Sequence, residues 1–272
     1  MKKFLIILGI ILIFGLGWLL KKDWREDDFK LGIITPDRVA LLSISPGRGM
    51  INLLTVNPEV ELWLPGGMGW YPSNRIKKIF DNDKNIDSID KMFYYNFGFV
   101  PEKIAFLTGV DQWREWRLMK YLGVVNWFRY VIEQDNWLYK TETISQSLDL
   151  EKEILDETLP RDFADNELQG GEIKISVVNA TEKNGLGAFV ADRLNWMGFN
   201  VVEVGSEAIK LECEIMVKTT TNALTKKYTD LLAKMFNCSQ VSNATLLPDE
   251  AILYLGQNYA QMLNYNSYVR TF

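Results

Sequence analysis

An uncharged apolar run near the N-terminus, residues 4–20, constrains this chain more than any other feature. As a helix, these 17 residues would rise about 25 Å at ~1.5 Å per residue. Flanking lysines can extend that length toward the ~30 Å of a bilayer core. A cleavable signal peptide needs small residues directly after the run, but Lys-Lys-Asp-Trp follows and the first alanine is Ala40. We therefore predict an uncleaved transmembrane helix at 4–20 rather than a buried core helix.

The composition excludes several classes of function. The chain has no histidine, which removes Ser-His-Asp and Cys-His nucleophiles and histidine-ligated zinc. A net charge of −5 and the absence of a basic, aromatic-rich stretch argue against a nucleic-acid partner. Two cysteines, Cys213 and Cys238, are too few for a disulfide framework or a zinc site. Any catalysis would have to use carboxylates, arginine, lysine or a bound metal.

Composition divides the rest of the chain into three regions. We predict a Trp-rich α/β domain at 31–143, an acidic linker at 144–171 and a C-terminal domain at 172–272. Within the linker, residues 145–171 carry eight acidic and two basic residues, which is typical of a solvated connector. Leu150, Ile154 and Leu155 have helical spacing there, and Pro160 closes that run, so one short helix is expected. The predicted class is α+β.

The C-terminal domain shows the clearest periodicity, because its pattern switches between 2 and 3.6 residues. Alternation predicts strands at 173–177, 200–204, 211–217 and 251–255, and apolar faces predict helices at 186–197 and 224–235. Gly198 stands where a left-handed residue ends a helix. The predicted order is β-α-β-β-α-β, with both helices packed on one face of the sheet.

The Trp-rich domain is less regular. Apolar runs at 38–45 and 51–56 flank Pro-Gly-Arg-Gly and predict a hairpin, and a third run covers 59–64. Trp113, Trp116, Met119 and Leu122 share one helical face, and a second helical segment is expected at 124–132.

These C-terminal residues resemble a known domain. The stretch ISVVNATEKNGLG (175–187), then VADRL (190–194), GFNVV (198–202) and ILYLG (252–256), is similar to the C-terminal domain of the LytR-CpsA-Psr family of bacterial envelope proteins. Ala180 departs from the family, which usually has glycine in that turn. Upstream, DRVALLSISP (37–46) and LLTV (53–56) resemble the first paired strands of the family's catalytic domain.

The resemblance implies a glycan phosphotransferase, because the family's catalytic domain transfers glycans from polyprenyl pyrophosphate with arginines, aspartates and magnesium. The family's Pro-Arg-Asp after the second strand aligns here with Asn57, Pro58 and Glu59, so the central arginine is missing. The second half of that domain has no counterpart before the acidic linker. We therefore expect a degenerate, truncated catalytic domain and no cofactor, with magnesium required only if the transferase reading holds.

Two candidate sites remain, each with a structural alternative. Asp37, Arg38 and Arg48, with Glu59, could hold a pyrophosphate, but an isolated pair of arginines supplies little charge stabilisation and structural roles in turns are favoured.

The loop between Trp63 and Trp70, including Gly66 and Gly67, could form an aromatic platform for a sugar or lipid headgroup, or simply pack a small core. Cys213 lies on the inward side of its strand, which favours a buried free thiol over a bridge to Cys238.

The expected function is that of a single-pass membrane protein of the bacterial cell envelope, without catalytic activity. Its partners would be the lipid bilayer and a wall glycan or an envelope protein, with the soluble body outside the cytoplasm. Charge alone leaves the orientation open, since Lys2 and Lys3 nearly balance Lys21, Lys22 and Arg25. The alternative is a divergent glycan phosphotransferase.

Overall fold

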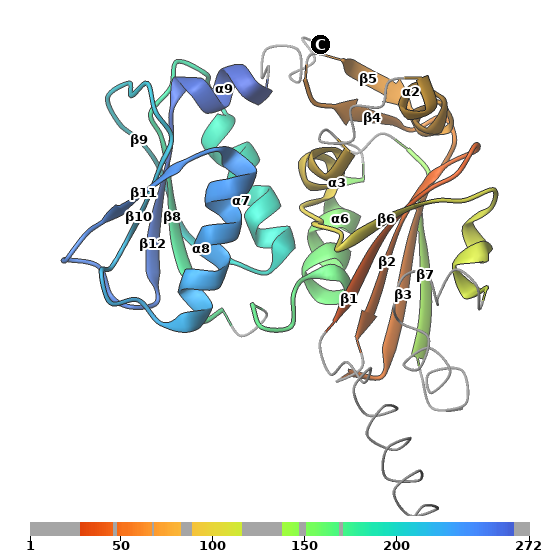
Figure 1. The fold of residues 1–272 in the computed structure, drawn as a ribbon, viewed down its shortest axis with the longest axis horizontal. Helices are drawn as coiled ribbons and strands as arrows, with labels where there is room; N and C mark the ends of the chain where they lie inside the picture. The colour runs from red at the N-terminus through yellow and green to blue at the C-terminus, as the bar shows by residue number, and fades with distance from the viewer. Residues whose placement is uncertain are drawn as a thin grey trace, which may run out of the picture.

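The protein has a mixed α/β fold with two units. The computed structural model describes residues 28–45, 48–66, 68–82, 89–115, 138–146, 151–168 and 171–263. Figure 1 shows an N-terminal unit, residues 28–168, beside a C-terminal unit, residues 171–263. Within these ranges no helix is both long and apolar enough to cross a bilayer, and the transmembrane helix expected at 4–20 lies outside them.

A five-stranded sheet in the order β6-β1-β2-β3-β7 forms the centre of the N-terminal unit. Its strands are β1 (Phe29–Ile34), β2 (Val39–Ser45), β3 (Met50–Val56), β6 (Lys103–Phe106) and β7 (Leu138–Ile144). The first three pair antiparallel, which confirms the predicted hairpin, while β6 and β7 add in parallel at the edges. All seven residues of β2 are buried, so both faces of the sheet are covered.

Smaller elements pack around this sheet. They are β4 (Glu61–Leu64), β5 (Gly69–Pro72), the 3-10 turns η2 (Ser73–Arg75) and η4 (Val110–Arg114), and the helices α2 (Ile76–Asn82) and α3 (Ile89–Phe97). The predicted third run is β4, but it pairs with β5 and not with the central sheet. Trp113 lies in η4, which ends at Arg114, and the remainder of the predicted helical face lies outside the described residues.

The acidic stretch after β7 is packed and not a solvated linker. It forms α6 (Lys152–Thr158) followed by a π-helical turn, η5 (Leu159–Phe163). Leu155 and Leu159 are fully buried, and Phe163 lies with them in the N-terminal core. The expected short helix is therefore present. Leu155 and Leu159 form a buried stripe, while Glu153, Asp156 and Glu157 are exposed, and Ile154 is 47% exposed with them.

The C-terminal unit has a second five-stranded sheet in the order β11-β10-β12-β8-β9. Its elements are β8 (Lys174–Asn179), α7 (Leu186–Met197), β9 (Asn200–Ser206), β10 (Glu214–Val217), α8 (Ala223–Phe236), β11 (Ser239–Ser242), β12 (Glu250–Leu255) and α9 (Gln257–Leu263). Two parallel β-α-β crossovers, β8-α7-β9 and β10-α8-β11, flank β12. The predicted order is thus found with two additions, β11 and α9.

Local sequence signals explain where these helices begin and end. Asn222 caps α8 by accepting a hydrogen bond from the backbone N–H of Thr225 at 2.7 Å. Gly198 ends α7 with a φ of 104°, as predicted. Both helices cover the sheet face that points toward the N-terminal unit (Figure 1). One strand is shorter than expected, because β10 begins at Glu214 and Leu211 is 67% exposed.

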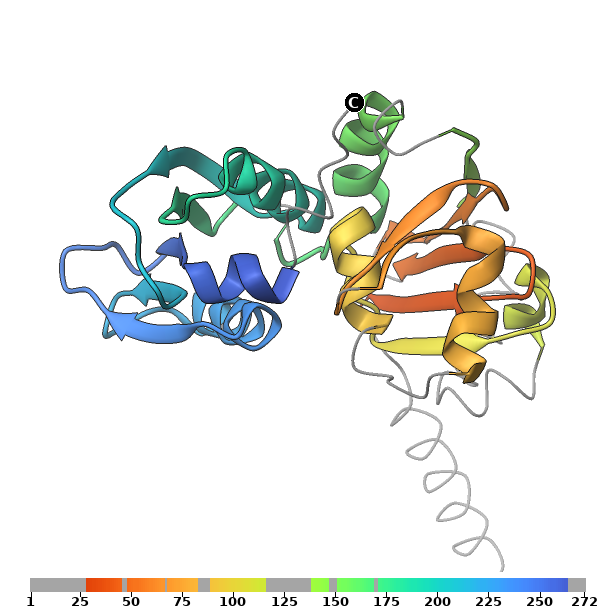
Figure 2. The ribbon, with the colours of Figure 1, turned by 90° about the horizontal axis from the view of Figure 1, so that it is seen from above.

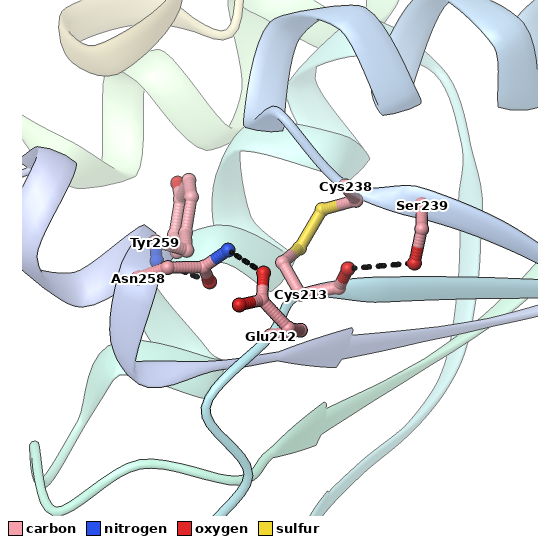
Figure 3. Close-up of a disulfide and its surroundings, with 6 residues drawn as sticks. All are labelled: Glu212, Cys213, Cys238, Ser239, Asn258 and Tyr259. Atoms are coloured by element: carbon pink, nitrogen blue, oxygen red, sulfur yellow. Dashed lines mark hydrogen bonds between the residues drawn. A yellow bond between two sulfur atoms is a disulfide. The ribbon is translucent and has the colours of Figure 1, made fainter.

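Cys213 and Cys238 form a disulfide, which corrects the prediction of a free thiol. Cys213 is buried, as its inward position required, but the chain turns back after α8 through the left-handed Asn237 and brings Cys238 alongside it. The two Cα atoms lie 4.6 Å apart. Figure 3 shows the bridge between the start of β10 and the start of β11, next to the hydrogen bond from Asn258 to Glu212.

The two units share a continuous apolar interface. Trp63, Tyr94 and Tyr95 of the N-terminal unit belong to the same buried cluster as the core of the C-terminal unit. The views in Figures 1 and 2 both place α3 and α6 next to α7. The guanidinium of Arg193 on α7 donates to the carbonyl oxygen of Tyr95 at 3.0 Å, so a polar contact also joins the units. An apolar interface that is continuous with the core of one unit favours a fixed arrangement of the two units.

Candidate functional site: a cleft between the two units

A cavity of about 800 Å³ lies where the N-terminal sheet meets the C-terminal unit. Three cationic residues come from the N-terminal side, and each is positioned by a different element. Arg48 follows β2, Lys140 lies on β7 and Arg161 lies in η5. On the C-terminal side, Asn195, Phe199 and Asn200 line the cavity at the end of α7 and the start of β9.

A polar row across the sheet leads to this cleft. The strand register places Lys30, Ser43, Asn52 and Lys140 opposite one another on β1, β2, β3 and β7. Asn52 is buried, and its amide donates to the carbonyl oxygen of Asp162 at 2.8 Å. Because successive strands lie ~4.8 Å apart, the row spans about 14 Å. Through the bond from Asn52, this row fixes η5 against the sheet.

Asp162 is the electrostatic centre of the cleft. Its side chain is only 2% exposed, and the Lys140 ammonium lies 3.4 Å from one carboxylate oxygen. Arg161 donates from Nε and Nη2 to the same carboxylate, at 3.1 and 2.8 Å. A buried carboxylate needs such partners, because desolvation would otherwise make its charged form unfavourable. The hydrogen bonds that Arg161 donates to Asp162 raise the pKa of the Arg161 guanidinium, which therefore stays charged.

Arg161 and Arg48 are connected through the backbone. Arg161 also donates to Glu157 at 2.7 Å, and Arg48 donates to the Arg161 carbonyl oxygen and to the Ser45 hydroxyl, both at 2.8 Å. The side chains of Lys140 and Arg161 are 33% and 45% exposed, so part of each faces the solvent-filled cleft. The cations are thus held in place by the chain itself while remaining accessible.

The opposite wall supplies neutral polar groups beside an apolar surface. Asn195 and Asn200 carry amides that can both donate and accept hydrogen bonds, and Phe199 lines the cavity with them. Gly198 can keep its φ of 104° because it has no side chain, and an added Cβ would lie 3.0 Å from that of Ala164. This wall is therefore set by the tight packing of α7 against η5.

The structure separates the residues predicted to hold a pyrophosphate. Asp37 and Arg38 lie in the turn between β1 and β2, where they form an exposed ion pair at 2.9 Å. The Thr35 hydroxyl donates to Asp37 and lowers its pKa. Arg48 lies at the other end of β2. Seven strand residues rise roughly 20 Å at ~3.3 Å each, so Arg38 and Arg48 cannot reach one pyrophosphate.

Glu59 lies in the turn after β3, at the same end of the sheet as Asp37. Its carboxylate is approached by the side-chain amide of Asn74 at 3.4 Å. Of the predicted group, only Arg48 contributes to the cleft.

The aromatic platform was one of two alternatives for this loop, and its first residue, Trp63, is not exposed. Trp63 is fully buried, and its ring centroid lies 5.7 Å from that of the partly buried Trp70 at an interplanar angle of 60°. Trp63 packs in the interface between the units, so its ring is not available to a sugar or lipid headgroup. Gly66 occupies the turn between β4 and β5 with a φ of 78°, and Gly67 lies outside the described residues.

Sequence reasoning missed Lys140, Arg161 and Asp162. The two adjacent residues of η5 looked like ordinary members of an acidic connector, because their role depends on how η5 folds back onto β3 and β7. A cation and a carboxylate beside Pro160, directly after a helical run, was the only local signal. Lys140 had no signal of its own, since strand registers across 80 or more residues are not visible in sequence spacing.

Comparison with known families identifies the C-terminal unit. Residues 172–259 match the family described as "LytR cell envelope-related transcriptional attenuator". The C-terminal unit is therefore a LytR C-terminal domain, as the motifs around Ile175 and Gly198 indicated. No curated protein matches the chain.

Several solved structures show a low similarity over most of the chain. The crystal structure of B. subtilis TagT has 9% identity and a TM-score of 0.25, covering 78% of this chain and 91% of that chain. TagT bound to LIIa-WTA has 8% identity and a TM-score of 0.24, with the same coverage of 78% and 91%. B. subtilis TagU has 10% identity and a TM-score of 0.24, covering 82% of this chain and 100% of that chain. At these TM-scores, nothing about the cleft or its ligand follows from those structures.

Proposed function

We propose that this protein is a membrane-tethered, extracytoplasmic protein of the cell envelope that binds an anionic wall glycan in the cleft between its two units, without catalysis. The observation that carries this proposal is the pairing of two walls. One wall presents Arg48, Lys140 and Arg161, and the other presents the amides of Asn195 and Asn200. Cations suit phosphate or carboxylate groups, and amides suit sugar hydroxyls.

Two further features support the location. The apolar run at 4–20 has the length and the flanking charges of a membrane anchor. The disulfide between Cys213 and Cys238 favours an oxidising compartment, because cytoplasmic thiols are normally kept reduced. The match of residues 172–259 to an envelope-related family agrees with the same compartment.

The positions of the charged residues favour binding over glycan transfer. Arg38 and Arg48 lie at opposite ends of β2, so the predicted catalytic candidates do not converge. In the cleft itself, Arg161 already contacts the carboxylates of Asp162 and Glu157. Transfer from a pyrophosphate requires several donors aimed at the charge that develops in the transition state. Because Arg161 is already paired with Asp162 and Glu157, the cleft is better suited to weak, repeated contacts along a polymer.

Binding can be measured with the full chain in a non-ionic detergent micelle. The probes are poly(glycerol phosphate) and dextran of similar length, an anionic and a neutral polymer. We expect the anionic polymer to bind more tightly, and its affinity to fall as salt screens the charges. Lys140→Met should weaken that binding about tenfold, the cost of losing one charge-assisted contact.

Lys210→Met is the matched control. Lys210 is 34% exposed and has one carboxylate partner at 3.1 Å, close to the 33% and 3.4 Å of Lys140, but it does not line the cleft. Equal affinity for both polymers, or equal loss in the two variants, would contradict the proposal. Transfer of a glycan from a polyprenyl pyrophosphate by the wild-type chain with magnesium, abolished by Arg38→Ala, would instead support the transferase alternative.

A further inference from the structure

The two carboxylates that contact Arg161 in the cleft differ in their exposure to solvent. Asp162 in η5 and Glu157 on α6 each accept hydrogen bonds from the guanidinium, through different nitrogens. The side chain of Asp162 is 2% exposed, whereas that of Glu157 is 76% exposed. Water and salt therefore compete with the contact to Glu157 far more than with the contact to Asp162.

The contact with Asp162 fixes the guanidinium in place. Nε of Arg161 lies 3.1 Å from each carboxylate oxygen of Asp162, and Nη2 lies 2.8 Å from Oδ2, so one edge of the planar group is held in a fork. The carbonyl oxygen of Asp162 also accepts from the Asn52 amide at 2.8 Å, which holds this part of η5 on the sheet. Breaking a buried ion pair leaves an uncompensated charge, so this contact is strongly unfavourable to lose.

The contact with Glu157 is much easier to break. Nη1 of Arg161 donates to Oε1 of Glu157 at 2.7 Å, across four positions of the chain. Both side chains reach solvent, and exposed ion pairs at this spacing contribute little to stability. Glu157 can therefore leave Nη1 while Asp162 keeps the guanidinium in position.

A ligand in the cleft would meet Arg161 on the side of Glu157, because the other edge of the guanidinium faces the buried Asp162. Arg161 and Glu157 both line the cavity, and Lys140 lines it as well. The Lys140 ammonium lies 3.4 Å from the Asp162 carboxylate that Arg161 also contacts, so the two cations are neighbours. Three cationic residues and two carboxylates line the cavity, so its net charge favours an anionic group.

We propose that Glu157 is a displaceable internal competitor for Arg161. In the protein without polymer its carboxylate occupies Nη1, and an anionic group of the bound polymer takes its place. This inference rests on the proposed function, because it concerns how the same cleft receives an anionic glycan. Asp162 is then a positioning residue, which holds the guanidinium in the same orientation in both states. Competition by Glu157 weakens each contact, so the polymer can be released and rebound along its repeats.

The Glu157→Gln variant tests the competition. The full chain in a non-ionic detergent micelle is titrated with poly(glycerol phosphate) and followed by calorimetry. Glutamine keeps the size of the side chain but removes its charge, so we expect binding about twofold to fivefold tighter than in the wild type. The variant should not gain stability in urea, because it loses an ion pair. A purely structural role of Glu157 would not raise the affinity.

Glu153→Gln is the matched control. Glu153 is exposed on the same helix and its substitution changes the net charge equally, but it does not line the cleft. Its affinity should stay close to that of the wild type. Asp162→Asn should act in the opposite direction and weaken binding about tenfold, because the guanidinium loses its support. Glu157 is exposed, so its variant should fold even if the Asp162 variant does not.

A second background separates competition for Arg161 from a general effect of charge. In an Arg161→Met chain, Glu157→Gln should bring no further gain, because its effect passes through Arg161. A gain that persists there would overturn the inference. Equal affinities of Glu157→Gln and Glu153→Gln, with the wild type binding the polymer, would overturn it and leave the proposed function standing. Absence of polymer binding in both the wild type and Glu157→Gln would overturn the proposed function and this inference together.

Discussion

Reduction of the disulfide between Cys213 and Cys238 should lower the free energy of unfolding by about 3.5 kcal/mol. The two residues are 25 positions apart, and they join the start of β10 to the start of β11 (Figure 3). For a loop of that length, cross-linking removes roughly 12 cal/mol/K of entropy from the unfolded chain, which gives the stated value at about 25 °C. Reduced thiols keep their packing, so reduction isolates the effect of the covalent link.

The assay is urea unfolding followed by circular dichroism, with and without a phosphine reductant. The double variant Cys213→Ala/Cys238→Ala serves as the control, because the reductant should not change its stability further. When the untreated chain is unfolded in urea in the presence of iodoacetamide, neither cysteine should be alkylated. Alkylation of both, or a loss below about 1 kcal/mol on reduction, would refute the reasoning.

Three other perturbations test the interface between the units. Gly98→Ala should destabilise the protein by several kcal/mol in the same urea titration, because Gly98 has a φ of 58° and an added Cβ would lie 2.5 Å from the Arg193 carbonyl oxygen. Gly66→Ala is the control. Gly66 has a φ of 78° but open space around it, so this variant should cost only the ~1–2 kcal/mol of backbone strain. Arg193→Met should cost about 1–3 kcal/mol in that assay, since it leaves the buried carbonyl of Tyr95 without its donor. Burial lowers the pKa of Lys30 from 10.5, so the unfolded chain binds more protons between the lowered value and 10.5, and stability rises with pH across that window. At pH 7 the charged form of Lys30 is disfavoured by burial, so Lys30→Met should raise the thermal midpoint. The same variant should remove the increase of stability with pH across that window. An unchanged thermal midpoint would argue against a charged Lys30 in this environment.

The C-terminal unit could be predicted well because its signals are local. The alternation at 173–177 and the apolar helical face at 186–197 each require only neighbours in the sequence, and Gly198 marks the helix end directly. The predictions failed where residue spacing was the only guide to a strand boundary or to a pairing of cysteines. Leu211 continued the alternation of β10 but lies outside the strand and is exposed. The disulfide depended on the turn at Asn237, which no periodicity indicated.

The candidate site could not be predicted because it is assembled from distant elements. Lys140 faces Asp162 only because β7 pairs in parallel with β3 while η5 packs over both. The acidic composition at 145–171 indicated solvation, yet Leu155, Leu159 and Phe163 bury one side of that segment. Composition averages over both sides of a helix, whereas packing depends on one. The paired strands around Arg48 were predicted, but the role of Arg48 in holding η5 was not.

Hydrogen–deuterium exchange with and without poly(glycerol phosphate) tests the binding cleft most directly, because it reports where the polymer lies on the chain. We expect slower exchange in peptides covering 157–163 and 195–200, the two walls of the cleft. Exchange across 250–255 in the C-terminal sheet should stay unchanged. The Lys140→Met variant should lose most of the protection at the same polymer concentration. Protection confined to other regions, or protection that persists fully in that variant, would contradict the assignment of the cleft as the polymer-binding site.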